Sequence, residues 1–348
     1  MRIALVAGKA TSLLNVAKDI AYVAQQRGHV PRIMSYVEAP STLAKLSDAV
    51  ILIYPASPLF CAEYMLLYRD LKIHYDKPAL YYTMIEGRPR KVHIAQWMLR
   101  DVEFIACSRY VRDKLQEVGF KVRAVIPHGL VREVIEEGRR LSPIARKHLQ
   151  RMHGDKVIFG VVSHSHVRKG LNFLSAAVRE LAEKRDDFVV HLVTNPEARR
   201  QVGDNPHIYV DTVFGTRSRE EIMAFLSAVD YLIMPSLAEG FGLPLVEANA
   251  CGTLAIHCAY PPLTEISDLE NNIVFEYNEV RHVYTGEGIE YEFHIYEPKI
   301  LAQAMDYAID LVHNYRSEYE ERSAKVRSVL DRLDAEKIYP SLLRLVGA

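Results

Sequence analysis

The first part of the chain alternates short apolar runs with longer amphipathic stretches. The apolar runs predict buried strands, at Arg2–Ala7, Ala49–Tyr54, Ala79–Thr83, Phe104–Cys107 and Val122–Ile126. The stretches between them have the spacing of helices, as at Leu13–Arg27, Ala62–His74 and Arg109–Val118. Continuous apolar strands separated by helices indicate a parallel sheet covered on both faces. The pattern predicts an α/β, Rossmann-like domain.

A second alternation of the same kind follows later in the chain. Its apolar runs are Val157–Val162, Phe188–Thr194, Ile208–Asp211, Tyr231–Met234, Leu254–Cys258 and Ile273–Glu276. The polar segment 132–143 and the basic segment 146–151 separate the two alternations, so we expect the interdomain connection there. A surface helix within one domain is the alternative. The predicted domains are residues 1–140 and residues 141–333.

Two late segments depart from the alternation. Residues 300–345 are charged and helical in period. The acidic, Tyr-rich segment 276–296 fits either a hairpin inserted beside a cleft or a long loop.

Composition is that of an ordinary soluble protein, with 348 residues, 49 % apolar and 25 % charged. A net charge of −1 argues against a nucleic-acid binder. No apolar run approaches the roughly 18 residues of a membrane span, so no transmembrane segment is expected. Four cysteines without C-x-x-C spacing indicate buried free thiols and a cytoplasmic location.

The most informative motif is the segment 235–252, which contains two carboxylates, Glu239 and Glu247, around a glycine-containing loop. An apolar run precedes the loop, Pro244 suits the first turn of a helix, and Gly252 suits its end. A strand, a glycine-containing turn and a helix start form a typical anion site. Carboxylates beside an anion site can bind hydroxyls, so the motif indicates a sugar phosphate or nucleotide sugar.

The segment Glu239-Gly-Phe-Gly-Leu-Pro-Leu-Val-Glu247 resembles the E-x7-E signature of retaining GT-B glycosyltransferases, in particular glycosyltransferase family four (group 1). The resemblance implies that Glu239 contacts the donor sugar and that Glu247 binds the ribose hydroxyls. The backbone of Gly240, Phe241, Gly242 and Leu243 would hold the sugar and diphosphate. An ordinary turn with two solvent-facing glutamates is the alternative.

The same resemblance implies the GT-B fold, with two Rossmann-like domains facing across a cleft. The C-terminal helix, residues 334–348, would cross back to pack on the first domain. These expectations agree with the two alternations in the sequence.

A pair of cations, Arg168 and Lys169, precedes a predicted helix in the second domain. Fixed cations stabilise the charge that develops on a leaving diphosphate. Lys169 matches the Lys-Gly element of the family, but the family's upstream arginine is missing from this chain. Either Arg168 or His164 takes its role, or the site has one fewer fixed charge.

Two candidates lie in the first domain. Gly8 follows the first strand, in a loop without a G-x-G-x-x-G fingerprint, and the resemblance places it near the donor phosphate. Glu86 is a candidate contact for the acceptor hydroxyl, with a plain loop carboxylate as the alternative.

Together these features predict a retaining glycosyltransferase of hexosyltransferase type, which moves a sugar from a nucleotide-diphosphate sugar to an acceptor hydroxyl. There is no Asp-x-Asp motif, and we expect neither a metal nor a cofactor. The acceptor is a glycan, a lipid or a small molecule, and peripheral membrane contact stays open. The alternatives are a catalytically silent nucleotide- or glycan-binding GT-B protein, and a sugar-nucleotide hydrolase or epimerase of the same fold.

Overall fold

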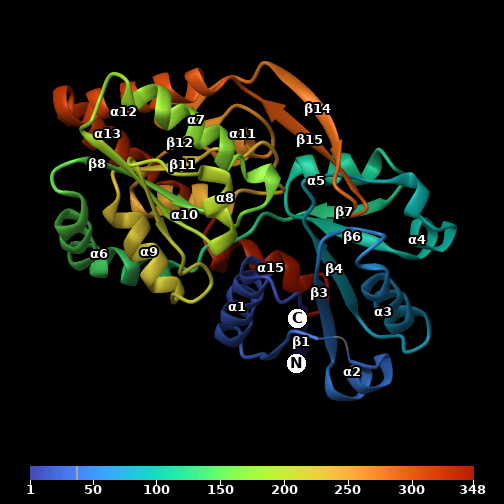
Figure 1. Cartoon of the computed structure of the whole chain (residues 1–348). Helices are drawn as coiled ribbons and strands as arrows, with labels where there is room; N and C mark the ends of the chain where they lie inside the picture. The colour runs from blue at the N-terminus through green and yellow to red at the C-terminus, as the bar shows by residue number, and fades with distance from the viewer. Residues whose placement is uncertain (37) are drawn as a thin grey trace. The chain divides into compact units, whose positions relative to one another are not determined.

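The computed structural model describes residues 1–36 and 38–348. The chain forms two compact units (Figure 1). The N-terminal unit consists of residues 1–131, 282–292 and 333–348. The C-terminal unit consists of residues 132–281 and 293–332.

The N-terminal unit is built on a six-stranded sheet in the order β2-β1-β3-β4-β6-β7, with every neighbouring pair parallel. Its strands are β1 (Arg2–Ala7), β2 (Val30–Met34), β3 (Ala49–Ile53), β4 (Ala79–Thr83), β6 (Glu103–Ala106) and β7 (Lys121–Val125). The helices between them are α1 (Thr11–Gln26), α2 (Pro40–Leu46), α3 (Ala62–Ile73), η1 (Lys91–His93), α4 (Gln96–Asp101) and α5 (Arg109–Gln116). The strands β3 and β4 are buried over their whole length, as expected for a sheet covered on both faces.

The C-terminal unit contains a second parallel sheet, in the order β10-β9-β8-β11-β12-β13. Its strands are β8 (Val157–Val162), β9 (Phe188–Val193), β10 (Ile208–Asp211), β11 (Tyr231–Met234), β12 (Leu254–Cys258) and β13 (Ile273–Phe275). Its helices are α6 (Arg132–His153), η2 (Val167–Lys169), α7 (Leu171–Ala182), η3 (Pro196–Ala198), α8 (Arg199–Val202), α9 (Arg219–Ala228), α10 (Leu243–Cys251), α11 (Leu263–Ile266), α12 (Pro298–Asn314), α13 (Arg316–Val326) and α14 (Val329–Arg332). The prediction of two Rossmann-like sheets is confirmed.

Segment 276–296 contains a hairpin, one of the two forms that the sequence left open. Its strands β14 (Glu279–Tyr284) and β15 (Ile289–Ile295) form a three-stranded sheet with β5 (Gly87–Pro89). The β15 residue Glu290 pairs with Arg88 of β5 in antiparallel register, and their side chains form an ion pair.

The structure differs from the sequence prediction between the two sheets. The polar segment 132–143 is not a connection but the first half of α6, a single helix that belongs to the C-terminal unit, so the units divide at residue 131 and not at 140. Pro143 lies inside this helix and has no N–H to donate to the carbonyl of Arg139. The hydroxyl of Ser142 donates to that carbonyl at 2.8 Å instead, so the carbonyl of Arg139 keeps a hydrogen-bond partner.

The C-terminal helix α15 (Ala335–Arg344) belongs to the N-terminal unit, as the fold prediction requires. In Figure 1 it lies beside α1, and the two helices are in contact. The backbone of Leu130 pairs with Asp334, and the N–H of Gly129 donates to the hydroxyl of Tyr339 at 2.9 Å. The buried Tyr339 ring therefore fastens the end of the chain to the loop after β7.

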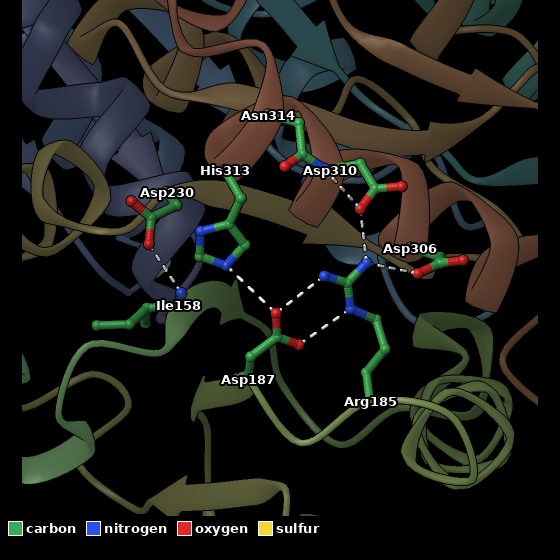
Figure 2. Close-up of polar contacts among 8 residues, drawn as sticks. All are labelled: Ile158, Arg185, Asp187, Asp230, Asp306, Asp310, His313 and Asn314. Atoms are coloured by element: carbon green, nitrogen blue, oxygen red, sulfur yellow. Dashed lines mark hydrogen bonds and ion pairs between the residues drawn. The ribbon is translucent and has the colours of Figure 1, made fainter.

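Polar contacts fasten α12 to the start of β9 in the C-terminal unit (Figure 2). The Arg185 guanidinium lies 2.9 Å from Asp187 and Asp306 and 2.8 Å from Asp310. The hydrogen bond to Asp187 is the main reason that the pKa of Arg185 is raised. Asp230 accepts from the backbone N–H of Ile158 at 2.8 Å and so fixes the start of β8.

All four cysteines are buried thiols that form no disulfide bond, as their spacing predicts. Within the described ranges 1–36 and 38–348, no helix is both long enough and apolar enough to cross a membrane.

The contact between α6 and α9 depends on Gly138. A Cβ atom built on this residue would lie 2.8 Å from the carbonyl carbon of Met223 and 3.0 Å from the nitrogen of Ala224. We therefore expect Gly138→Ala to lower the free energy of unfolding by about 1–3 kcal/mol, the usual cost of overpacking. Denaturant titration measures this, with Gln150→Ala at an exposed position of the same helix as the control. Equal stability of the two variants would contradict the packing role of Gly138.

Candidate functional site

The candidate site is built at the point where the strand order of the C-terminal sheet reverses. The strands β8 and β11 are neighbours there, and their connections run in opposite directions along the sheet. Ligands of such sheets bind beyond the carboxyl ends of the strands at this switch point. The loop after β8 carries Arg168 and Lys169, and the loop after β11 carries Glu239. The topology therefore brings together residues about 70 positions apart in the sequence.

Glu239 is buried, with 6 % of its surface exposed, and it is paired with both cations. Arg168 Nη1 lies 3.2 Å from Glu239 Oε2, and Lys169 Nζ donates to Glu239 Oε1. The two oxygens of the carboxylate therefore each face a cation. Glu239 and the two partly buried cations form a triad with a formal charge of +1.

The triad keeps Glu239 ionised. Burial by itself raises the pKa of this carboxyl, but the charges of Lys169 and Arg168, together with hydrogen bonds from Lys169 and Ser236, lower it further than burial raises it. The pKa of Glu239 consequently lies below its ordinary value. An ionised carboxylate accepts hydrogen bonds only, which suits it to a hydroxyl-bearing ligand.

Backbone contacts fix the two loops against each other. The N–H of Leu237 donates to the carbonyl of Arg168 at 2.7 Å. Gly170 has a φ of 63°, and a Cβ atom there would lie 3.1 Å from the carbonyl carbon of Pro235. Only glycine allows this approach in a left-handed conformation, so the Lys169-Gly170 element sets the distance between the cations and Glu239.

Side chains from later in the chain satisfy the carbonyls of the Glu239 loop. The hydroxyls of Tyr296 and Tyr260 donate to Pro235 and Ser236 at 2.8 and 2.9 Å. The N–H of His294 donates to Leu237 at 2.9 Å. None of the three supporting residues was predicted. For Tyr296 the Tyr-rich composition of segment 276–296 was the available signal, because a tyrosine buried among loops needs a partner for its hydroxyl.

The helix α10 begins immediately after the glycine-containing loop, so its first backbone N–H groups lie at the site. Gly242 precedes it with a φ of 101°, and a Cβ atom there would lie 2.6 Å from Leu263. Pro244 stands in the first turn and Gly252 caps the end, as the sequence predicts. Gly240 and Phe241 are buried, whereas Leu243 is partly exposed.

Glu247 lies on α10 and is 8 % exposed. Its Oε1 is 3.5 Å from Nη2 of Arg219, at the start of α9. Arg219 is a further residue that the sequence alone did not point to. The signal was the Ser218-x-x-Glu221 capping box, which the structure contains and which places the next residue, Arg219, in the first helical turn.

Three further candidates lie elsewhere. His164 is exposed, with its ring 6.2 Å from that of Phe214, and it makes no ion pair with Glu239 among the contacts described. Gly8 and Glu86 belong to the N-terminal unit. A Cβ atom on Gly8 would lie 2.7 Å from Leu13 and 3.2 Å from Tyr54, so this residue permits close packing after β1. Glu86 is half-buried between β4 and β5.

In the described part of the chain, outside residue 37, no group of three or more His, Cys, Asp or Glu side chains is placed to hold a metal ion. The charges gathered at the site are the two cations and the glutamates already described.

Part of the chain matches a known protein family, and the chain has curated relatives. Residues 155–285 match the family described as Glycosyl transferases group 1. The uncharacterized glycosyltransferase 335 of Sulfolobus islandicus rod-shaped virus 1 is 28 % identical over 99 % of this chain and 100 % of its own length. The uncharacterized glycosyltransferase MJ1178 of Methanocaldococcus jannaschii is 25 % identical over 60 % of this chain and 54 % of its own length.

Solved structures resemble both units together. A glycosyltransferase from Rickettsia africae has a TM-score of 0.74 at 14 % identity and covers 99 % of this chain and 97 % of its own. Anabaena HepE, solved in complex with UDP and glucose, has a TM-score of 0.69 at 15 % identity. The match covers 100 % of this chain and 99 % of the HepE chain. The fold is therefore GT-B, which confirms the fold prediction. The match over residues 155–285 agrees with the resemblance to group 1 glycosyltransferases seen in the sequence.

The low pKa of Glu239 makes stability depend on pH. Glu239→Gln leaves two partly buried cations without their buried carboxylate and should lower the free energy of unfolding by about 3 kcal/mol at pH 7, the low end for breaking a buried ion pair. Since the folded-state pKa is lowered, the ion pairs contribute fully above the unfolded pKa of about 4.3 and are lost as the pH falls through the folded value. The difference between wild type and variant should therefore narrow below about pH 4.

Chemical denaturation between pH 3 and pH 7 measures this difference. Glu183→Gln is the matched control, since Glu183 is an exposed glutamate at the end of α7. If the difference in free energy of unfolding between wild type and Glu239→Gln stays constant over this pH range, Glu239 is not an ionised, paired carboxylate.

Proposed function

We propose that this protein is a retaining glycosyltransferase that moves a sugar from a nucleotide-diphosphate sugar to an acceptor hydroxyl without a metal ion. The observation that supports it most is the triad of the buried Glu239 with Arg168 and Lys169 at the switch point. The triad combines an excess of positive charge, suited to a diphosphate, with a carboxylate suited to a sugar hydroxyl. The group 1 domain match includes all three residues.

The diphosphate of the donor would bind at the start of α10, on the backbone of Gly240 to Leu243, and beside the two cations. Helix N-termini stabilise anions through their unpaired N–H groups and their dipole. Glu247, held beside Arg219, would accept hydrogen bonds from the ribose hydroxyls. HepE, which shares the fold, binds UDP and glucose, so uridine nucleotides are the first donors to test.

Arg168 would replace the upstream arginine that the family has and this chain lacks. It already lies 3.2 Å from Glu239 beside Lys169, whereas His164 is exposed. When the bond between the anomeric carbon and the phosphate oxygen breaks, negative charge grows on the leaving diphosphate. Arg168 and Lys169 would stabilise this charge in the transition state.

In the proposed reaction the acceptor oxygen bonds to the anomeric carbon on the face that the leaving group departs from. The acceptor's proton passes to the leaving phosphate oxygen. Such a step needs no second carboxylate as base. Fixed cations would do the work that a metal ion does elsewhere, and activity should therefore survive EDTA. Glu86 would contact the acceptor hydroxyl, and Gly8 would leave room for the donor phosphates.

Lys169→Ala should lower turnover by about 10²–10³-fold, the usual cost of losing one preorganised stabiliser of developing charge. Initial rates with the active donor and acceptor measure this, and the anomeric configuration of the product by NMR tests retention. Lys147→Ala, at an exposed lysine on α6, is the control. A loss below about threefold would contradict the proposed role of Lys169.

The donor can be identified by thermal shift with UDP, GDP, ADP and their sugar conjugates. A ligand at 100 times its Kd stabilises the folded state by about 2.7 kcal/mol, which should raise Tm by a few degrees, and Lys169→Ala should reduce the shift. Binding without turnover of any acceptor would indicate a catalytically silent binding protein. Donor consumption without acceptor would indicate a hydrolase or epimerase. No shift with any nucleotide would overturn the assignment of the donor site.

A further inference from the structure

A polar cavity lies in the C-terminal unit, at the opposite end of α10 from the candidate donor loop. It has a volume of about 450 Å³. Its walls come from α6, the end of α9, the last residue of α10 and the segment after α13. The side chains that matter here are Arg139, Arg140, Glu136, Ser227, Cys251 and Arg327.

The arginines of this cavity differ in their pairing. Arg140 forms an ion pair with Glu137 at 2.6 Å. Among residues 1–36 and 38–348, neither Arg139 nor Arg327 has a carboxylate at ion-pair distance. The pKa of Arg327 is lowered, first by burial and then by the charge of Arg139. Two guanidinium groups therefore line one cavity, and the carboxylate in its wall, that of Glu136, makes no ion pair with either of them among the described residues.

The position of Arg327 is determined by the end of α10. Gly252 ends this helix with a φ of 92°, and a Cβ atom there would lie 2.9 Å from Nη2 of Arg327. The hydroxyl of Ser323 donates to the carbonyl of Gly252 at 2.5 Å and fastens α13 to the same turn. The guanidinium consequently lies over the backbone of Gly252 at the cavity wall.

The position of Arg139 is determined by α6. Gly138 lets this helix approach α9 closely, and the next residue, Arg139, lines the cavity together with Ser227 in the last turn of α9. The charge of Arg139 also reaches the buried Cys251 thiol, whose pKa burial raises to about 12. This thiol is neutral at physiological pH, so it supplies no negative charge to balance the arginines.

We propose that this cavity binds the phosphate group of a small phosphorylated molecule between Arg139 and Arg327. Guanidinium groups match phosphate oxygens with paired hydrogen bonds, and a bound dianion would remove the repulsion between the two side chains. The cavity is larger than a phosphate ion and falls in the usual range of about 300–1,000 Å³ for small-ligand pockets. The proposal is independent of the proposed glycosyl transfer.

Isothermal titration with inorganic phosphate and with glycerol 3-phosphate tests the proposal, at constant ionic strength set with chloride. Arg139→Gln and Arg327→Gln should each weaken binding at least about tenfold, as expected for the loss of one charge-assisted hydrogen bond. Arg151→Gln is the matched control, because it removes the same charge from an exposed position at the far end of α6. Melting curves without ligand show that each variant is folded, and Arg139→Lys, which keeps the charge, supplies a milder substitution.

The donor site could bind phosphate as well, so the titrations are repeated in the Lys169→Ala background. Binding that survives Lys169→Ala and is lost in Arg139→Gln supports the arginine cavity. Binding that is lost only with Lys169→Ala overturns it.

A further experiment tests whether the phosphate group belongs to a soluble molecule or to a lipid headgroup. Flotation with phosphatidic acid vesicles, against phosphatidylcholine vesicles, measures membrane binding by the same variants. If only the vesicles bind, and Arg139→Gln and Arg327→Gln abolish this, the phosphate group belongs to a lipid. If neither the titrations nor the flotation distinguish Arg139→Gln and Arg327→Gln from Arg151→Gln, the cavity is not a phosphate site.

Discussion

The arrangement of the C-terminal unit depends on one buried carboxylate. A carboxylate removed from water is stable only when it is paired and hydrogen-bonded, and Glu239 meets both conditions through Lys169, Arg168 and Ser236. The two cations lie in the loop after β8, and β8 is the strand next to β11. Their ion pairs with Glu239 therefore fix the loops after β8 and β11 relative to each other. The left-handed Gly170 and the hydrogen bond from Leu237 to Arg168 follow from this constraint, since the cations cannot reach Glu239 unless the two backbones lie in contact.

The same burial sets a requirement on the backbone. The loop 235–242 is buried along its length, and buried carbonyls without partners are costly. Tyr296, Tyr260 and His294 satisfy three consecutive carbonyls of this loop. These residues follow β12 or belong to the end of the hairpin region. The late, Tyr-rich part of the chain is therefore a support of the candidate site as well as a connection between elements.

The sequence was sufficient for features that depend on local pattern. Continuous apolar runs predicted most strands of both sheets, and Pro244 and Gly252 predicted the bounds of α10. It failed where a local signal is weak or ambiguous. Strand β2 was missed because Pro31 and Arg32 interrupt its apolar pattern, which an edge strand tolerates. Helix α6 was taken for a connection because it is highly charged and contains Pro143. The contacts of Arg219, Tyr260 and Tyr296 join distant segments, and a single sequence does not specify such pairs.

The missing upstream arginine does not leave the candidate site short of charge. Arg168 and Lys169 are adjacent in a 3-10 turn, yet they reach different oxygens of the same carboxylate. Glu239 therefore holds both side chains in place before any ligand binds. Fixing a long cationic side chain costs up to about 2 kcal/mol of conformational entropy, and the folded protein has met this cost in advance. A carboxylate with charge −1 holds two cations but does not neutralise them. In the proposed function, the remaining positive charge would attract the donor diphosphate, and the ion pairs that stabilise the loop would also prepare it for that phosphate.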